Sequence, residues 1–220
     1  MNKFFLSILF SALSAHAGVW TRTDSHSIRF EGYITAGDSE ALDIILRSND
    51  KILFVNSKGG DAEVGLQLAI KLFPNKLTII VDGNCASSCA NYLFTAGAKK
   101  EIKKGWVGYH GNMTALLAMD WGKNAREMKV KNGLTDKQIE SFHSHLLELA
   151  QLEKKYLATI GVNQSLFNRT QSEDKGMGDG KSYTFLCPKP ETFELYGIKN
   201  VTGHQDIVYE SLPGLNNILD

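Results

Sequence analysis

The chain has 220 residues, of which 43% are hydrophobic, and its 24 basic and 24 acidic side chains give a formal net charge of zero. This length and apolar content favour one compact domain with its own core. The lack of a basic excess argues against a nucleic-acid-binding surface, and four prolines with no biased tract argue against long disordered regions.

The N-terminus has the pattern of a secretory signal. Lys3 precedes an apolar run at 4–13 that, at about ten residues, is too short to span a bilayer, and a small-x-small cleavage motif ends at Ala17. We therefore expect a signal peptide at 1–17 and a single mature domain at 18–220, either periplasmic or secreted. The alternative is an uncleaved anchor. No later apolar run has membrane-spanning length, so we expect no membrane association of the mature form.

Strand and helix patterns alternate before residue 112, as in a parallel sheet with helical crossovers. Period-two or continuous apolar runs predict the strands, and helical spacing with cap residues predicts the helices. The predicted strands are 27–34, 52–55, 77–81 and 107–109, and the predicted helices are one opened by 37–39, one at 61–73 capped by Asp61, and one at 88–95 after a turn at 83–87.

The pattern changes after Asn112. Asp136–Ile160 is predicted to be one long amphipathic helix, followed by a glycine-rich loop at 171–181, a short strand at 183–186 and a helix at 190–196. The apolar stripe of the long helix comprises Ile139, Phe142, Leu146, Leu149, Leu152 and Tyr156.

Two histidines lie on the same long helix. We interpret His143 and His145 as a solvent-facing or interface pair rather than as metal ligands.

A serine and a histidine that each follow a predicted strand are the candidate catalytic residues. Ser87 lies between a buried strand and a helix, so it projects from the carboxyl end of the sheet, where α/β folds place ligands. His110 follows another strand and would serve as general base. Alone, Ser87 would be read as a helix cap and His110 as a structural histidine, so the interpretation depends on both.

A glycine pair adds a third component. Gly59 and Gly60 follow a different buried strand, where glycines allow the backbone to present N–H groups. The functional interpretation is an oxyanion site that shares the N–H of Ser88, and the alternative is an ordinary strand-to-helix turn.

The cysteines bear on the same turn. Cys85 and Cys89 flank Ser87 symmetrically, and in an oxidising compartment a sharp turn would bring them to bridging distance. We expect a disulfide that stiffens the turn. The alternatives are two buried small side chains and, less favoured, metal ligation, because no second ligand pair has zinc-like spacing. Cys187 is left as a buried free thiol. We expect no metal and no cofactor.

Together these segments resemble the proteolytic subunit of the Clp protease, in the ClpP/crotonase-like superfamily, and most of all the exported bacterial ClpP-like proteins with a C-A-S-x-C turn. The resemblance covers 28–111 well and 191–201 loosely. It implies a ClpP/crotonase-like α/β fold of repeated ββα units. The matching motifs are Asn56-Ser57-Lys58-Gly59-Gly60, Gly83-Asn84-Cys85-Ala86-Ser87, Phe94-Thr95-Ala96-Gly97-Ala98-Lys99, His110 and Glu194-Leu195-Tyr196-Gly197-Ile198.

The resemblance also implies roles for individual residues. Ser87 would be the nucleophile, His110 the base, and the N–H groups of Gly60 and Ser88 the oxyanion donors. The unmatched segment 112–182 is expected to be a divergent helical region. Clp-like subunits assemble into rings, so a homo-oligomer is implied, although this segment leaves assembly open.

The acid of the family's triad has no match at its expected place. That register falls near Phe185, where no carboxylate is present; Asp179 is the nearest candidate and Asp174 the next. A backbone carbonyl or a water is another way to orient the imidazole. A Ser–Lys dyad, as in signal-peptide peptidases of similar fold, would use Lys129 or Lys131.

The leading hypothesis is an exported serine hydrolase, and more narrowly a peptidase, that acts through an acyl-enzyme on peptides or unfolded segments. The first alternative is a catalytically inactive ClpP-like peptide-binding module, suggested by the missing acid. The second is crotonase-like chemistry on a coenzyme A thioester, against which export argues.

Overall fold

The structure, a computed structural model, describes residues 17–172 and 185–206. Within these residues the strands form one sheet, in which β1 is antiparallel to β2 and every other neighbouring pair is parallel. This arrangement confirms the predicted α/β class. In spatial order the strands are β1 (Val19–Arg22), β2 (Ser27–Glu31), β3 (Ile52–Ser57), β4 (Thr78–Ala86), β5 (Lys99–Gly108) and β6 (Val201–Gly203).

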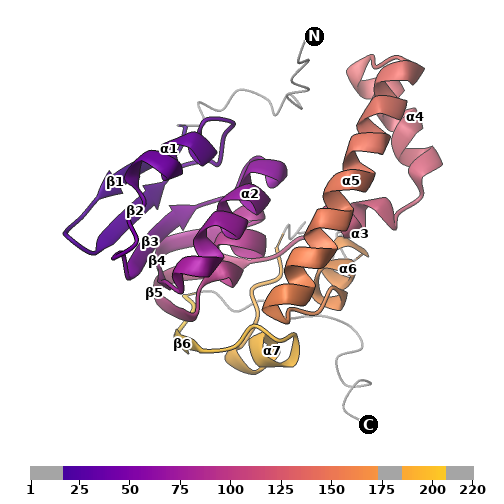
Figure 1. Cartoon of the computed structure of the whole chain (residues 1–220). Coiled ribbons are helices and arrows are strands. Elements are labelled where there is room, and N and C mark those ends of the chain that lie inside the picture. The colour runs from indigo at the N-terminus through magenta and orange to yellow at the C-terminus, as the bar shows by residue number, and fades with distance from the viewer. Residues whose placement is uncertain (1–16, 173–184, 207–220) are drawn as a thin grey trace.

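Helices connect the parallel strands and extend away from them. Figure 1 shows α1 and α2 on one face of the sheet, and α5 as a long arm that leaves the sheet layer with α4 beside its outer part. None of the helices in the described ranges has the length and apolarity that a membrane span requires. The helices are α1 (Asp38–Ile45), α2 (Ala62–Leu72) with the 3-10 turn η1 (Phe73–Asn75), the π-helix η2 (Cys89–Phe94), α3 (Met113–Leu117), α4 (Trp121–Asn132), α5 (Asp136–Ile160), α6 (Ser165–Ser172) and α7 (Pro190–Leu195).

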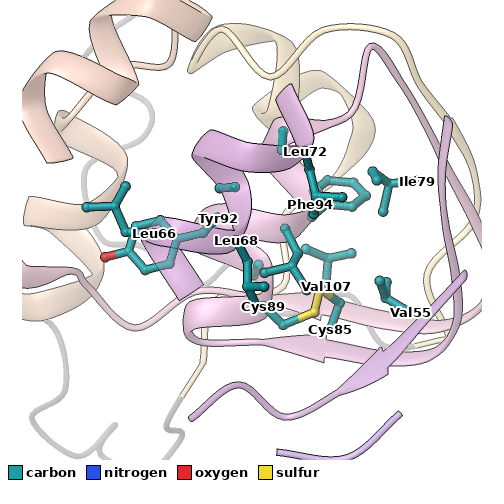
Figure 2. Close-up of a cluster of buried hydrophobic side chains, with 14 of the residues drawn as sticks. Val55, Leu66, Leu68, Leu72, Ile79, Cys85, Cys89, Tyr92, Phe94 and Val107 are labelled. Atoms are coloured by element: carbon teal, nitrogen blue, oxygen red, sulfur yellow. A yellow bond between two sulfur atoms is a disulfide. The ribbon is translucent and has the colours of Figure 1, made fainter. Parts of the chain in front are cut away.

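The core lies between the sheet and the helices α2 and η2. Alternating side chains of β3 and β4, such as Val55 and Ile79, face this layer and are fully buried. Leu68 of α2 and Phe94 of η2 pack against them (Figure 2). Because burial of a large apolar side chain contributes about 1.5–3 kcal/mol, this layer fixes the strand ends that carry the candidate site.

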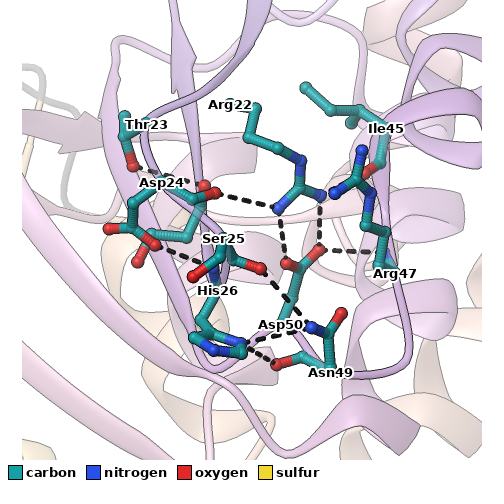
Figure 3. Close-up of polar contacts among 10 residues, drawn as sticks. Arg22, Thr23, Asp24, Ser25, His26, Ile45, Arg47, Asn49 and Asp50 are labelled. Atoms are coloured by element: carbon teal, nitrogen blue, oxygen red, sulfur yellow. Dashed lines mark hydrogen bonds and ion pairs between the residues drawn. The ribbon is translucent and has the colours of Figure 1, made fainter.

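A polar cluster at the edge of the sheet holds β1 in place (Figure 3). The Arg22 guanidinium donates from Nη1 to Asp50 Oδ1 at 2.8 Å and from Nη2 to the Ile45 carbonyl at 2.6 Å. Asp50 also accepts a hydrogen bond from the Arg47 amide at 2.8 Å. Hydrogen bonding from Arg22 lowers the pKa of Asp50. The cluster therefore joins β1 to the C-terminus of α1.

The predicted turn at 83–87 is wrong, because β4 continues as a strand to Ala86. It stays paired with β5 as far as the Ala86–Gly108 register. At the register shift between β3 and β4, Asn56 Oδ1 accepts a hydrogen bond from the Asn84 amide at 3.0 Å. A side chain thus replaces a ladder hydrogen bond, which local sequence patterns do not reveal.

β5 is also longer than the predicted strand 107–109. It begins at Lys99 because its first residues pair with β4, although they are mostly charged. Lys100, on the core side, is buried and donates to the Gly97 carbonyl at 2.7 Å. Because these residues are mostly charged, the apolar pattern of the sequence did not predict the first half of the strand.

The long helix α5 has the predicted bounds. A capping box formed by Thr135 and Gln138 sets its start. Its buried stripe was only partly predicted: Leu152 is 40% exposed, whereas Glu153 is 0% exposed.

The remaining predictions have mixed outcomes. Asp61 caps α2 as predicted, by accepting from the Val64 amide at 3.0 Å. The sequence patterns did not predict β1 or β6, and they predicted a helical region at 112–182 without distinguishing α3, α4 and α6 within it. The predicted loop at 171–181 overlaps the end of α6, and its part from 173 onward lies outside the described residues, as do the signal segment 1–16 and positions 183–184 of the predicted strand.

Candidate active site

Ser87 occupies a strained position between β4 and η2. Its φ is +54°, in the left-handed region that residues with a side chain rarely adopt. Its amide donates to the Gly108 carbonyl at 2.9 Å, and its carbonyl accepts from the Asn91 amide at 2.8 Å. These bonds attach the strained residue to β5 on one side and to the π-helix on the other, so its side chain stands at the carboxyl end of the sheet.

His110 lies against Ser87, as predicted. It follows β5 directly, and the parallel pairing of β4 with β5 brings the two strand ends together. The His110 Nε2–Ser87 Oγ distance is 2.6 Å, within the range of a strong O–H···N hydrogen bond. In the tautomer with the proton on Nδ1, the serine hydroxyl donates to Nε2. This is the arrangement that general-base activation of a serine requires.

The predicted glycine turn closes over the serine. A Cβ at Gly59 would lie 2.8 Å from Ser87 Cβ and 2.9 Å from Ser88 N, so a side chain has no room there. The Gly59 carbonyl accepts from the Ile34 amide at 2.9 Å. Because C=O and N–H point in opposite directions in a trans peptide, the Gly60 N–H points away from Ile34.

Ser88 joins the serine turn to the glycine turn. Its hydroxyl donates to the Gly60 carbonyl at 3.1 Å. Its own N–H lies at the N-terminus of η2, where backbone N–H groups lack helical acceptors. The N-terminal end of a helix dipole also carries a partial positive charge. The structure therefore brings together Ser87, His110, Ser88 and the glycine turn.

The predicted disulfide is present directly beneath the serine. Cys85 and Cys89 are bonded, with their Cα atoms 5.2 Å apart, and both are fully buried in the core (Figure 2). Cys187 is a buried free thiol, as predicted, and burial raises its pKa to about 12. Within the described ranges no group of three potential metal ligands is found.

The structure describes only part of the region where the third residue of the triad was expected. Both Asp179 and Asp174 lie outside the described residues. Phe185, at the register where the family resemblance expects the acid, places the edge of its ring against His110 at a centroid distance of 5.2 Å. It also packs against Trp106 at 5.5 Å. An aromatic side chain therefore borders the imidazole here.

The alternative lysines have other partners. Lys129 pairs with Asp136 at 2.8 Å, and Lys131 pairs with Glu127 at 3.0 Å, all on exposed parts of the α4–α5 arm. Neither pairing involves Ser87, so the structure gives the Ser–Lys dyad no support.

The two histidines of α5 also have separate partners. His143 stacks on Trp121 at a centroid distance of 4.0 Å, and His145 bonds Glu63 of α2 at 2.9 Å. His145 is exposed and His143 is half-buried, and the two side chains have different neighbours.

A buried asparagine near the site was missed. The side chain of Asn91 is in η2 and donates from Nδ2 to the Gly111 carbonyl at 2.7 Å, next to His110. The sequence does contain a signal for it, because a polar residue inside an apolar run must satisfy its hydrogen bonds when buried.

Comparisons with known proteins add little to this geometry. No protein-family model and no curated protein matches the chain. Among solved structures, the chain is similar to the ECH2 decarboxylase domain of CurF from Lyngbya majuscula, with 11% identity, 71% of this chain and 90% of that chain covered, and a TM-score of 0.28.

Proposed function

We propose that this protein is a serine hydrolase with Ser87 as nucleophile and His110 as general base. The observation that carries the proposal is the 2.6 Å distance between Ser87 Oγ and His110 Nε2. Oγ would attack a substrate carbonyl while Nε2 takes its proton, and the imidazolium would then return that proton to the leaving group. Water, deprotonated by the same nitrogen, would hydrolyse the acyl-enzyme and free Ser87.

The negative charge on the tetrahedral intermediate needs donors beside the nucleophile. The N–H groups of Gly60 and Ser88 are the proposed donors, as in the Clp-like resemblance. The proposal is supported by the close approach of Gly59 to Ser87 and by the Ser88 hydroxyl bond to Gly60. Loss of one oxyanion donor typically costs about 10²–10³ in rate.

The proposed substrates are peptides or unfolded protein segments, by resemblance to the Clp proteolytic subunit. The proposed location is the periplasm or the outside of the cell, which the Cys85–Cys89 disulfide supports, since disulfides persist in oxidising compartments. A homo-oligomer is proposed on the same resemblance. Asp179 stays the first candidate for the group that orients His110.

The test is labelling with a fluorophosphonate probe, which phosphonylates activated serines with loss of fluoride. Oxidised protein should bind the probe, and Ser87→Ala and His110→Ala should abolish the reaction. Ser144→Ala and His145→Ala are matched controls, because both side chains are exposed on α5, and they should label as wild type does. Equal labelling of wild type and Ser87→Ala across several pH values would contradict the proposal.

One observation favours a second candidate, a peptide-binding module without catalysis. Phe185 presents an apolar ring to His110 where the family resemblance expects an acid. In that case peptides would bind equally to wild type and Ser87→Ala, and neither protein would react with the probe.

A further inference from the structure

The carboxyl group of Glu153 is fully buried where three segments meet. It lies on α5 with 0% exposure, and burial raises its pKa. One carboxylate oxygen accepts a hydrogen bond from the Tyr92 hydroxyl, and the other accepts from the Thr114 amide at 2.8 Å. Both oxygens therefore have protein donors, as a buried carboxyl requires.

The two donors belong to the two halves of the candidate site. Tyr92 is in η2, the helix that begins two residues after Ser87, and Thr114 is in α3, which begins three residues after His110. Neither segment is joined to the other by strand pairing at this point. Glu153 thus bridges the backbone that follows the nucleophile and the backbone that follows the base.

Further contacts make the junction tight. Tyr156, one helical turn along α5 from Glu153, donates its hydroxyl to the Tyr92 carbonyl at 3.3 Å. On the α2 side, a Cβ at Gly65 would lie 2.9 Å from Tyr92 Cδ2. The Tyr92 ring is therefore held between α2 and α5, and a shift of α5 would be transmitted to η2.

A purely structural role is a poor explanation for a carboxyl group here. Replacing a buried charged group with apolar residues of similar volume is often neutral or stabilising, whereas leaving it unpaired is costly. A leucine at this place on α5 would fill the space without desolvating a carboxyl. What a leucine lacks is two acceptor atoms that fix separate segments in one geometry.

Resting on the proposed function, we infer that Glu153 is a positioning residue that sets the alignment of Ser87 with His110 through Tyr92 and Thr114. It touches neither reacting atom, so it would change the rate at which Ser87 reacts with substrate or probe and not the affinity for the probe. Misplacement of reacting groups by about 1 Å can cost roughly 100-fold in rate.

The test separates positioning from folding. Glu153→Gln keeps the shape with one acceptor oxygen, and Tyr92→Phe/Glu153→Leu replaces the hydroxyl–carboxyl pair with apolar groups. Tyr109→Phe is the matched control, because its hydroxyl is also buried but has no hydrogen-bond partner within the described residues. For each protein, thermal unfolding, probe affinity and the maximal rate constant for phosphonylation by the probe are measured.

Both Glu153 variants should lose roughly 10-fold to 100-fold in the maximal rate constant with probe affinity unchanged, while Tyr109→Phe stays within about twofold of wild type. A merely structural role would instead lower the folded fraction and leave the rate constant of the folded molecules unchanged. That result would overturn the inference.

Hydrogen exchange provides a readout that does not depend on activity. Tyr92→Phe/Glu153→Leu should lose amide protection in α3 and η2 together, and Tyr109→Phe should not. A wild type that fails to react with the probe would contradict the proposed function alone. Unchanged protection of both segments in the double variant would overturn the positioning role whether or not the protein reacts.

Discussion

At the scale of single residues, the site depends on close approach between backbone segments. The glycine pair, the serine and the histidine were predicted from their order in the sequence. The left-handed conformation of Ser87 was not, because the chain lacks the G-x-S-x-G pattern that marks a strained serine in α/β-hydrolases. Glu153 was missed because a helical stripe shows which apolar residues are buried and cannot show which acid has buried donors.

Substituting Gly59 with alanine should destroy the site. The added methyl group would lie 2.6 Å from the Ala86 carbonyl oxygen, and φ is +88° at this position. We expect Gly59→Ala to reduce fluorophosphonate labelling about 100-fold or more, as for loss of an oxyanion donor. Gly37→Ala is the control, because nothing lies within 4 Å of its added Cβ. If Gly59→Ala were labelled to the same extent as wild type, the close contact of Gly59 with Ala86 would be unimportant for the reactivity of the site.

At the scale of elements, β4 and η2 hold the serine turn from both sides. The sequence predicted the strand core at 77–81 and the helix at 88–95. It did not predict that β4 extends to Ala86, because that extension depends on pairing with β5 and on a side chain from β3. Contacts with residues distant in the sequence cannot be seen in the local pattern of residues. The spacing of the two cysteines can be seen there, and it correctly predicted the disulfide.

Removing the disulfide should affect the turn more than the fold. The closed loop is short, so the chain-entropy contribution to unfolding free energy is only about 2 kcal/mol. We expect the double variant Cys85→Ala/Cys89→Ala to remain folded in urea titrations at 25 °C and to react more slowly with the fluorophosphonate than wild type, because Ser87 would no longer be held at positive φ. An unchanged rate of reaction with the fluorophosphonate would mean that the π-helix and β5 alone fix the turn.

Acid should weaken the attachment of β1 to the sheet. The folded-state pKa of Asp50 is lowered, chiefly by its hydrogen bond from Arg22, so its contribution is present above the unfolded pKa of about 3.9 and is lost as pH falls through the folded value. Asp50→Asn should therefore lower the unfolding midpoint at pH 7, with the difference from wild type shrinking below about pH 4.

The control for this prediction is Asp43→Asn. Asp43 pairs with Lys71 at 2.6 Å, but its side chain is 60% exposed. Surface ion pairs of this kind contribute little to the free energy of unfolding. The variant should therefore have the unfolding midpoint of wild type both at pH 7 and below about pH 4. A pH-independent effect of Asp50→Asn would contradict the ion-pair explanation.

At the scale of the whole molecule, the sheet and the α4–α5 arm differ in how well they were predicted. The sheet half matches the alternating pattern of strands and helices that the sequence shows before 112. The bounds of α5 follow from its local caps, but its direction does not, because packing against η2 and α3 sets it. The arm reaches back to the site through Glu153, so it is physically joined to the sheet segments that carry Ser87 and His110.

The central claim is that Ser87 is a nucleophile activated by His110. Its most direct measurement is mass spectrometry of intact, oxidised protein after reaction with a fluorophosphonate, followed by mapping of the modified peptide. We expect one adduct, located on Ser87 and absent from His110→Ala. No adduct at any pH, or an adduct on another residue that persists in Ser87→Ala, would contradict the claim.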